Sequence, residues 1–120
     1  MTYTVLIVDD SKVSRMMLHA MINRERPQWQ ILEASSGQEA IELASRESIQ
    51  LISMDLNMPG MDGIEAAEKI HDLHQETKII LLTANVQQSV RQRAANAQLH
   101  FSAKPINERT LSDLLTFAGA

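Results

Sequence analysis

The chain has 120 residues, of which 44% are hydrophobic and 22% charged, a size and composition typical of one globular domain with a single core. Its net charge of −4 argues against non-specific nucleic-acid binding, and the absence of cysteine excludes disulfides, thiol nucleophiles and cysteine-ligated zinc. No apolar stretch is long enough to span a bilayer and the N-terminus lacks a secretory signal, so we expect a cytoplasmic protein that contacts no membrane.

Short apolar runs predict the strands of one sheet. Three of these runs are almost continuous in Val, Ile and Leu, which is typical of strands buried on both faces of a parallel sheet. A fourth run alternates more and is expected near the edge of the sheet, and a fifth strand is weaker in pattern. The predicted strands are 4–8, 29–34 (the alternating one), 49–54, 78–83 and 99–103 (the weak one).

Segments with helical spacing of apolar residues separate the strands. In the first helix one stripe is expected to face the core, and Ser36 with Glu39 predicts a capping box at the start of the second. Asn107 is expected to cap the last helix. Alternating strands and helices predict parallel pairing with right-handed crossovers, and therefore an α/β fold. The predicted helices are 11–25 (stripe Ser14, Met17, Leu18, Met21, Ile22), 36–46, 63–74, 86–95 and 107–117.

Chemically active residues follow the predicted strands directly. Asp9 and Asp10 end the first strand, Asp55 ends the third, Thr83 ends the fourth, and Lys104 follows the fifth. In an open parallel sheet, ligands bind at the carboxyl ends of the strands, near the point where strand order reverses. We therefore expect three acids, a hydroxyl and an ammonium to meet at one edge of the sheet.

Such a group of side chains is suited to a divalent cation and a phosphoryl group. Three neighbouring carboxylates repel one another unless a cation is bound, and oxygen ligands without histidine or cysteine favour Mg²⁺. A lysine ammonium and a threonine hydroxyl can bond phosphoryl oxygens. The expected chemistry is phosphoryl transfer, with a carboxylate as the candidate nucleophile.

Five motifs resemble those of the response-regulator receiver domain of two-component signalling, and the resemblance covers essentially the whole chain. It implies a three-layer (βα)5 sandwich with a doubly wound, flavodoxin-like parallel sheet of order 2-1-3-4-5. It also implies a stand-alone receiver domain over residues 1–120, without an output domain, similar to the chemotaxis regulator. The motifs are LIVDDS (6–11), EASSGQEAI (33–41), MDLNMPGMDG (54–63), LLTA (81–84) and AKP (103–105).

The resemblance implies a phosphoacceptor and a metal site. Asp55 would accept a phosphoryl group from a phosphohistidine of a histidine kinase or phosphotransfer protein, or from a small phosphodonor. Asp10 and Asp55 would bind Mg²⁺ through their carboxylates, Asn57 through its backbone carbonyl, and Asp9 through metal-bound water. Mn²⁺ is a possible substitute for Mg²⁺.

The resemblance also implies a switch. Thr83 and Lys104 would contact the phosphoryl oxygens, and the Lys104–Pro105 peptide bond would be cis. Thr83 would move toward the phosphoryl group while the ring of Phe101 rotates inward. The surface over 86–117 would then change its affinity for a downstream protein of unknown identity. A monomer or weak dimer is expected.

Two other classes of function are weighed against this one. An aspartate-nucleophile phosphatase on a similar scaffold typically needs a second acid two residues after the nucleophile, where Asn57 stands. A phosphorylation-independent binding module is the other alternative, and loss of an acid or of the lysine would favour it.

Asn57 and Asn85, two residues after Asp55 and Thr83, would modulate the lifetime of the phosphorylated form, in a direction that stays open. Self-phosphorylation and self-dephosphorylation are the only activities expected.

The loop after Asp55 is rich in residues that favour turns. Pro59 and Gly60 predict the turn itself, and Gly63 is expected to relieve the entry to the third helix. Met58 and Met61 flank this loop and are candidates for contact with a partner, whereas the other methionines are interpreted as core and loop filling.

Several further residues carry no catalytic interpretation. His71 and His74 are interpreted as part of a solvated helix face, and Arg91 and Arg93 as either partner contacts or a solvated face. Trp29 is expected to pack at the end of the sheet away from the acids. At residues 97–98, Ala-Gln stands where the family often has Gly-Ala, which predicts a tighter turn or a longer preceding helix.

Overall fold

The computed structural model describes residues 2–119, in which five strands alternate with five helices. The predicted alternation is confirmed, and no element boundary differs from the expected one by more than two residues. The strands are β1 (Thr4–Val8), β2 (Gln30–Ala34), β3 (Leu51–Asp55), β4 (Lys78–Thr83) and β5 (His100–Ala103). The helices are α1 (Lys12–Glu25), α2 (Gly37–Arg46), α3 (Gly63–Leu73), α4 (Gln88–Asn96) and α5 (Glu108–Ala118).

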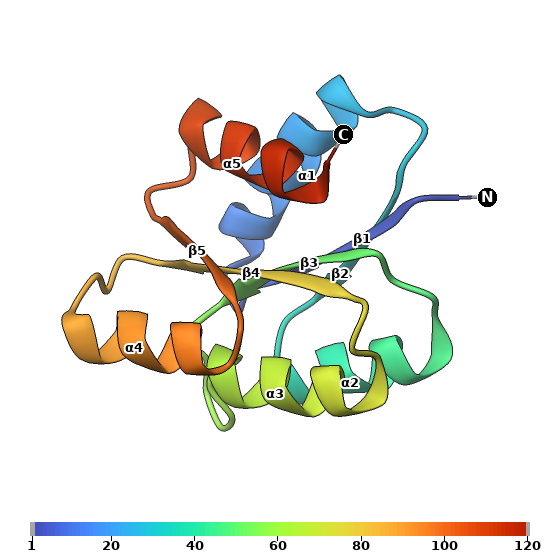
Figure 1. Cartoon of the computed structure of the whole chain (residues 1–120). Helices are drawn as coiled ribbons and strands as arrows, with labels where there is room; N and C mark the ends of the chain where they lie inside the picture. The colour runs from blue at the N-terminus through green and yellow to red at the C-terminus, as the bar shows by residue number, and fades with distance from the viewer. Residues whose placement is uncertain (1, 120) are drawn as a thin grey trace.

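The strands form one parallel sheet in the order β2-β1-β3-β4-β5. Figure 1 shows three layers, with α1 and α5 on one face of the sheet and α2, α3 and α4 on the other. The predicted doubly wound α/β fold is therefore confirmed. The chain runs from β1 outward to β2 and then returns to place β3 on the other side of β1. The carboxyl ends of β1 and β3 consequently flank the point where strand order reverses.

Alternate residues of the central strands contribute to two separate cores. Val5 and Ile7 of β1 pack with α1 and α5, whereas Leu6 and Val8 pack with α2, α3 and α4. Because each side chain of the strand meets a helix layer, the apolar run is continuous rather than alternating. This double burial holds β1 and β3 in place. Of the acids described below, one ends β3 and two follow β1 directly.

Helix α1 departs from the expected pattern. Leu18 and Ile22 are buried as predicted, but Met17 is 46% exposed, so its assignment to the core was wrong. Val13 and Met16 are also exposed, at 66% and 57%. The spacing of these three residues places them on one side of the helix. We call Val13, Met16 and Met17 the α1 patch.

The predicted helix caps are formed, with one difference. The Ser36 hydroxyl accepts a hydrogen bond from the Glu39 N–H at 3.1 Å, but the Glu39 carboxylate accepts from the Ser35 N–H rather than from that of Ser36. The reciprocal capping box predicted there is therefore absent. Asn107 caps α5 and forms a capping box with Thr110.

The turn from α4 into β5 closes with a residue in the left-handed conformation. Gln98 has a φ of 61°, and its N–H and that of Leu99 donate to the carbonyls of Ala95 and Ala94. This is the Schellman arrangement that usually places glycine at the left-handed position. Helix α4 ends at Asn96.

His71 and His74 do not belong to a purely solvated face, contrary to our expectation. Each ring is partly buried and lies within hydrogen-bond distance of a main-chain carbonyl: 3.1 Å separates His71 Nε2 from the Thr77 oxygen, and 3.0 Å separates His74 Nε2 from that of Ala44. The two histidines therefore tether the end of α3 to neighbouring segments.

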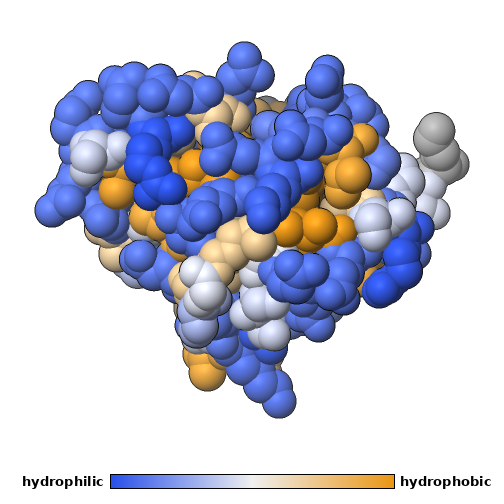
Figure 2. Space-filling view, turned by 90° about the horizontal axis from the view of Figure 1, so that it is seen from below, coloured by the Kyte–Doolittle hydropathy of each residue, from blue (hydrophilic) through white to orange (hydrophobic). Residues whose placement is uncertain are grey.

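The outer face of the lower helix layer, α2 to α4, is mainly hydrophilic, with apolar residues visible between the helices (Figure 2). This distribution is typical of amphipathic helices that turn one side to a core. Among residues 2–119, no helix has both the length and the apolar character that crossing a membrane requires.

Candidate functional site

Three acids gather at the carboxyl edge of the sheet, as the strand ends predicted. Asp9 and Asp10 follow β1, and Asp55 is the last residue of the neighbouring strand β3. Carboxylate oxygens of all three lie within 4.8 Å of one another. Asp9 and Asp55 are only 5% and 6% exposed, whereas Asp10 is open to solvent. The site is thus a rigid, half-enclosed acidic pocket with one face toward water.

Lys104 brings a positive charge into this pocket from the end of β5. Its Nζ lies 3.0 Å from Asp9 Oδ2 and 3.1 Å from Asp55 Oδ1. The Lys104 main chain is held by a hydrogen bond from its N–H to the Thr83 carbonyl, and the peptide bond from Lys104 to Pro105 is cis. The ammonium therefore bridges two carboxylates that the sheet alone would leave unpaired.

Burial and charge set the protonation of the pocket. Burial raises the pKa of Asp55, and the neighbouring Asp9 raises it further, while Lys104 opposes both effects. Burial lowers the pKa of Lys104, but its hydrogen bonds and charge interactions with Asp9 and Asp55 outweigh this, so that the pKa of Lys104 is raised overall. The pocket therefore favours additional positive charge.

The donor set fits a hard divalent cation. Three carboxylates converge, and the cluster contains no histidine or cysteine that would favour a softer metal. Mg²⁺ takes one or two carboxylates and keeps waters, which suits a pocket with one open face. Asn57 follows Asp55 by two residues in the loop before α3, and the direction of its carbonyl stays a prediction.

The loop between β3 and α3 is shaped by its glycines. Gly60 has a φ of +78°, which agrees with the predicted turn after Pro59. Gly63 opens α3 in direct contact with the end of β3, because a Cβ there would lie 2.9 Å from the Asp55 carbonyl carbon. Its N–H also donates to the Leu56 carbonyl at 2.9 Å. The absence of a side chain at Gly63 therefore lets α3 begin against the strand that carries Asp55.

The two methionines of this loop lie differently from our expectation. Met58 is only 8% exposed and belongs to the core beneath α2, α3 and α4, so the prediction that it contacts a partner was wrong. Met61 is partly buried and packs against the same core. The loop is thus anchored inward by both methionines.

Thr83 ends β4 beside the pocket and is fully buried. Its hydroxyl oxygen accepts a hydrogen bond from the Asn85 N–H at 3.0 Å, and the Asn85 side chain accepts one from the Gln87 N–H at the same distance. The start of α4 is therefore connected to Thr83 through a short chain of hydrogen bonds, which continues from the edge of the acidic pocket.

Phe101 is partly buried on β5 and is covered by an arginine that the sequence did not assign. The guanidinium carbon of Arg91 lies 4.8 Å from the centre of the Phe101 ring, and Arg91 Nε donates to the Val86 carbonyl at 3.1 Å. A guanidinium at this distance over an aromatic face forms a cation–π contact. Arg91 thus holds Phe101 against α4.

Arg93 and Asp62 give α4 a second attachment. Arg93 Nη2 lies 2.9 Å from Asp62 Oδ2, while Asp62 Oδ1 accepts the Glu65 N–H at 2.9 Å and so caps α3. Asp62, which had no predicted role, therefore joins the loop after Asp55 to α4. Neither Arg91 nor Arg93 is therefore simply solvated. Arg93 and Asp62 are 31 residues apart, which explains why no local sequence pattern predicted their ion pair.

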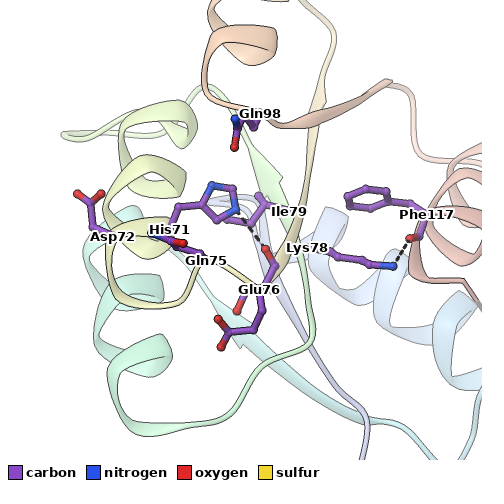
Figure 3. Close-up of a pocket in the computed structure, with 9 residues that line it drawn as sticks. His71, Asp72, Gln75, Glu76, Lys78, Ile79, Gln98 and Phe117 are labelled. Carbon is purple, nitrogen blue, oxygen red and sulfur yellow. Dashed lines mark hydrogen bonds between the residues drawn. The ribbon is translucent and has the colours of Figure 1, made fainter.

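A separate cavity of about 540 Å³ lies at the opposite, amino-terminal edge of the sheet (Figure 3). Two of its side chains are engaged in bonds to main-chain carbonyls: His71 lies within hydrogen-bond distance of the Thr77 carbonyl, and Lys78 donates to the Phe117 carbonyl at 3.1 Å. None of the residues predicted for the site lines this cavity.

The doubly wound sheet carries three acids and a lysine at its carboxyl edge, which form an acidic pocket on a flavodoxin-like fold. Residues 5–116 match the response regulator receiver domain, and the chain belongs to this family of two-component signalling proteins. Receiver domains are signalling proteins rather than conventional enzymes, and they bind Mg²⁺ through an acidic pocket of this kind.

Individual relatives agree with this assignment. The transcriptional regulatory protein SrrA of Staphylococcus aureus is 43% identical over 91 residues, which are 76% of this chain and 36% of SrrA; the chain thus spans about a third of that relative. The response regulator TrrA of Thermotoga maritima, solved with Mg²⁺ and BeF, is 27% identical with a TM-score of 0.85 over 98% of this chain and 99% of that one. The Ssk1 receiver domain of Saccharomyces cerevisiae, solved with the histidine phosphotransfer protein Ypd1, is 26% identical with a TM-score of 0.87, over 98% of this chain and 90% of that one. Chemotaxis regulators share the fold as well.

Proposed function

We propose that this protein is a cytoplasmic, phosphorylation-controlled signalling switch whose phosphoacceptor is Asp55. The observation that carries the proposal is the position of the Asp55 carboxylate, buried at the end of β3, 3.1 Å from the Lys104 ammonium and beside two further acids. The donor would be a phosphohistidine of a histidine kinase or phosphotransfer protein, as the complex of the Ssk1 receiver with Ypd1 suggests.

In the proposed transfer an oxygen of Asp55 attacks the phosphorus, the N–P bond of the phosphohistidine breaks, and the electron pair remains on the imidazole nitrogen, which then takes a proton. Asp9, Asp10, Asp55 and the main-chain carbonyl of Asn57 would hold Mg²⁺, which supplies positive charge for the phosphoryl oxygens. Lys104 leaves its bridge between carboxylates and pairs with the transferred group. The buried, pre-organised carboxylate requires little rearrangement for the attack.

The α1 patch is suited to receive the phosphodonor. Val13, Met16 and Met17 form an exposed apolar surface on the helix that starts two residues after Asp10. Apolar side chains that remain exposed together on one face mark sites of protein contact. A helical donor seated there would bring its phosphohistidine to the open side of the pocket.

The response would pass through Thr83 and Phe101 to the face of α4, β5 and α5. Thr83 would turn its hydroxyl toward the phosphoryl group and release the bond from Asn85, and Phe101 would move inward. The Arg91 contact over the ring would then change, which alters the surface offered to a downstream protein. Asn57 and Asn85 are proposed to modulate the lifetime of the phosphorylated state.

The test is phosphorylation by acetyl phosphate in the presence of Mg²⁺, followed by intact mass. We expect one added phosphoryl group in the wild type and in Asp72→Asn, a control at an exposed acid of α3, and none in Asp55→Asn. Removal of divalent cations should abolish the adduct and Mn²⁺ should restore it. An unmodified, folded wild type would refute the proposal, as would an adduct that persists in Asp55→Asn.

A further inference from the structure

Arg15 of α1 contacts the acidic pocket through the main chain of Asp9. Its Nη1 donates to the Asp9 carbonyl at 2.7 Å, and its Nε donates to Glu33 Oε1 at 3.0 Å. The Arg15 side chain is only 16% exposed, although it lies on an outer helix. One guanidinium therefore joins three segments: α1, the turn after β1, and β2.

We propose that Arg15 is a positioning residue for the metal site, which it serves by fixing the peptide between Asp9 and Asp10. This inference rests on the proposed Mg²⁺-dependent function. Arg15 touches neither the cation nor the phosphoryl group. It acts on the main chain from which two of the three acids project.

Asp9 is held at each of its polar groups. Its N–H donates to the Ala34 carbonyl at 3.1 Å, and its carboxylate accepts from the Ser11 N–H at 2.9 Å and from Lys104 at 3.0 Å. The bond from Arg15 occupies the remaining group, the Asp9 carbonyl. All four bonds converge on a residue that is itself 5% exposed.

The position of the Asp10 carboxylate depends on the bond from Arg15 to the Asp9 carbonyl more than the position of the Asp9 carboxylate does. None of these four bonds involves the Asp10 carboxylate, which is exposed and yet lies in the acid cluster. Its position is therefore set by its own main chain, whose preceding peptide plane carries the carbonyl bonded by Arg15. A rotation of that plane would swing the Asp10 carboxylate away from Asp55.

The guanidinium is suited to this task because its nitrogens form a rigid, planar fork. Glu33, which takes one branch of the fork, also lies 2.8 Å from His19 Nδ1, so the acceptor is held on two sides. A lysine could bond the Asp9 carbonyl or Glu33, but a single ammonium at the end of a flexible chain would orient the peptide less well.

Charge and positioning predict opposite outcomes when Arg15 is neutralised. If Arg15 acted only as a nearby cation, its removal would make the pocket more negative and Mg²⁺ would bind more tightly. If Arg15 positions Asp10, its removal weakens Mg²⁺ binding in spite of the more favourable charge. The sign of the change therefore separates the two roles.

The experiment is calorimetric titration of the full chain with MgCl2 in the wild type, Arg15→Gln, Arg15→Lys and Arg24→Gln. We expect the Kd for Mg²⁺ to rise about tenfold in Arg15→Gln, the scale of losses when a partner behind a metal ligand is removed, with partial rescue in Arg15→Lys. Arg24→Gln removes the same charge from the same helix, where Arg24 pairs with Glu25 and Glu108, and should leave the Kd unchanged.

A second readout uses the metal-free protein. In ¹H–¹⁵N spectra without Mg²⁺, the Asp10 amide, which belongs to the peptide bonded by Arg15, should shift or broaden in Arg15→Gln and stay near its wild-type position in Arg24→Gln. A purely structural role elsewhere in α1 would not single out this amide.

Equal or tighter Mg²⁺ binding in Arg15→Gln would overturn the inference while leaving the proposed function intact. If Arg15→Gln does not fold, Arg15→Lys decides: weaker binding than in the wild type supports the inference, and identical binding overturns it. A wild type that binds no Mg²⁺ and accepts no phosphoryl group would overturn the proposed function and this inference together.

Discussion

Gly63 lies so close to Asp55 that a side chain at position 63 would overlap the main-chain oxygen of the phosphoacceptor candidate. The helix that follows the loop is thereby seated directly on the end of β3. The constraint is one of space rather than of backbone conformation, since the left-handed glycines of residues 2–119 are Gly60 and Gly119.

Gly63→Ala is expected to lower the free energy of unfolding by about 3 kcal/mol, because the atoms that the new methyl group meets are mostly backbone and cannot move aside cheaply. Gly60→Ala is the matched control: it has free space but a positive φ, and should cost about 1 kcal/mol. Urea unfolding measures both. Equal stabilities for the two variants would contradict the close approach of α3 to Asp55.

The protonation of Asp55 predicts a pH-dependent stability. Its pKa is raised in the folded protein, first by burial and then by the charge of Asp9, so the ionised form destabilises the fold. This contribution favours the folded state at low pH and is lost as pH rises through the folded pKa. Asp55→Asn should therefore be more stable than the wild type at neutral pH, by about 1 kcal/mol.

The difference should shrink toward acid pH, where Asp55 becomes protonated in the wild type. Thermal unfolding of the wild type and of Asp55→Asn between about pH 4 and pH 7 measures this difference in stability. At neutral pH, Mg²⁺ should raise the Tm of the wild type more than that of Asp55→Asn. A difference that grows on acidification would show that the sign of the pKa shift is wrong.

Asp62 is expected to stabilise the protein mainly as a helix cap and less through its ion pair. Asp62→Ala loses both contacts and should cost about 1 to 2 kcal/mol, whereas Asp62→Asn keeps the cap and should cost less than about 1 kcal/mol. Arg93→Ala removes only the exposed ion pair and should match Asp62→Asn. A double-mutant cycle on unfolding free energies measures the coupling, and a coupling near zero would exclude the attachment of α4 through this pair.

Gln98→Gly should stabilise the protein by about 0.5 to 1 kcal/mol, because Gln98 occupies a left-handed position at the end of α4. Ala97→Gly, one residue earlier, at a φ of −88°, is the control and should not stabilise. The check is chemical denaturation, and a destabilised Gln98→Gly would show that the glutamine side chain contributes more than its backbone strain costs.

Trp29 is expected to report phosphorylation weakly. It stacks on Tyr3 at 4.2 Å between ring centres and precedes β2, whose first residue pairs with Thr4 at the edge away from the acids. Addition of Mg²⁺ and beryllofluoride should leave its emission nearly unchanged. A Trp29→Phe, Phe101→Trp variant should respond clearly, and a large change in the wild type would contradict the distance between Trp29 and the pocket.

The sequence by itself determined the architecture and the composition of the site. Continuous runs such as that of β1 are typical of strands buried on both faces, so they predicted a parallel sheet between helix layers. Because parallel strands end at one edge, the residues after the runs, Asp9, Asp55 and Lys104, could be placed together without a structure. The confirmed order of strands came from the family resemblance, since local patterns carry no information on neighbours.

Only the tertiary structure decided which side chains complete the site. Met17 faces solvent and Met58 the core because helix and loop orientations depend on packing partners rather than on helical period alone. The contacts of Arg15 with Asp9 and of Arg93 with Asp62 join separate elements through single hydrogen bonds. A periodic apolar pattern repeats over many residues and can therefore be recognised in the sequence. A polar contact of this kind has no such pattern, because it forms only after the fold has brought its two residues together.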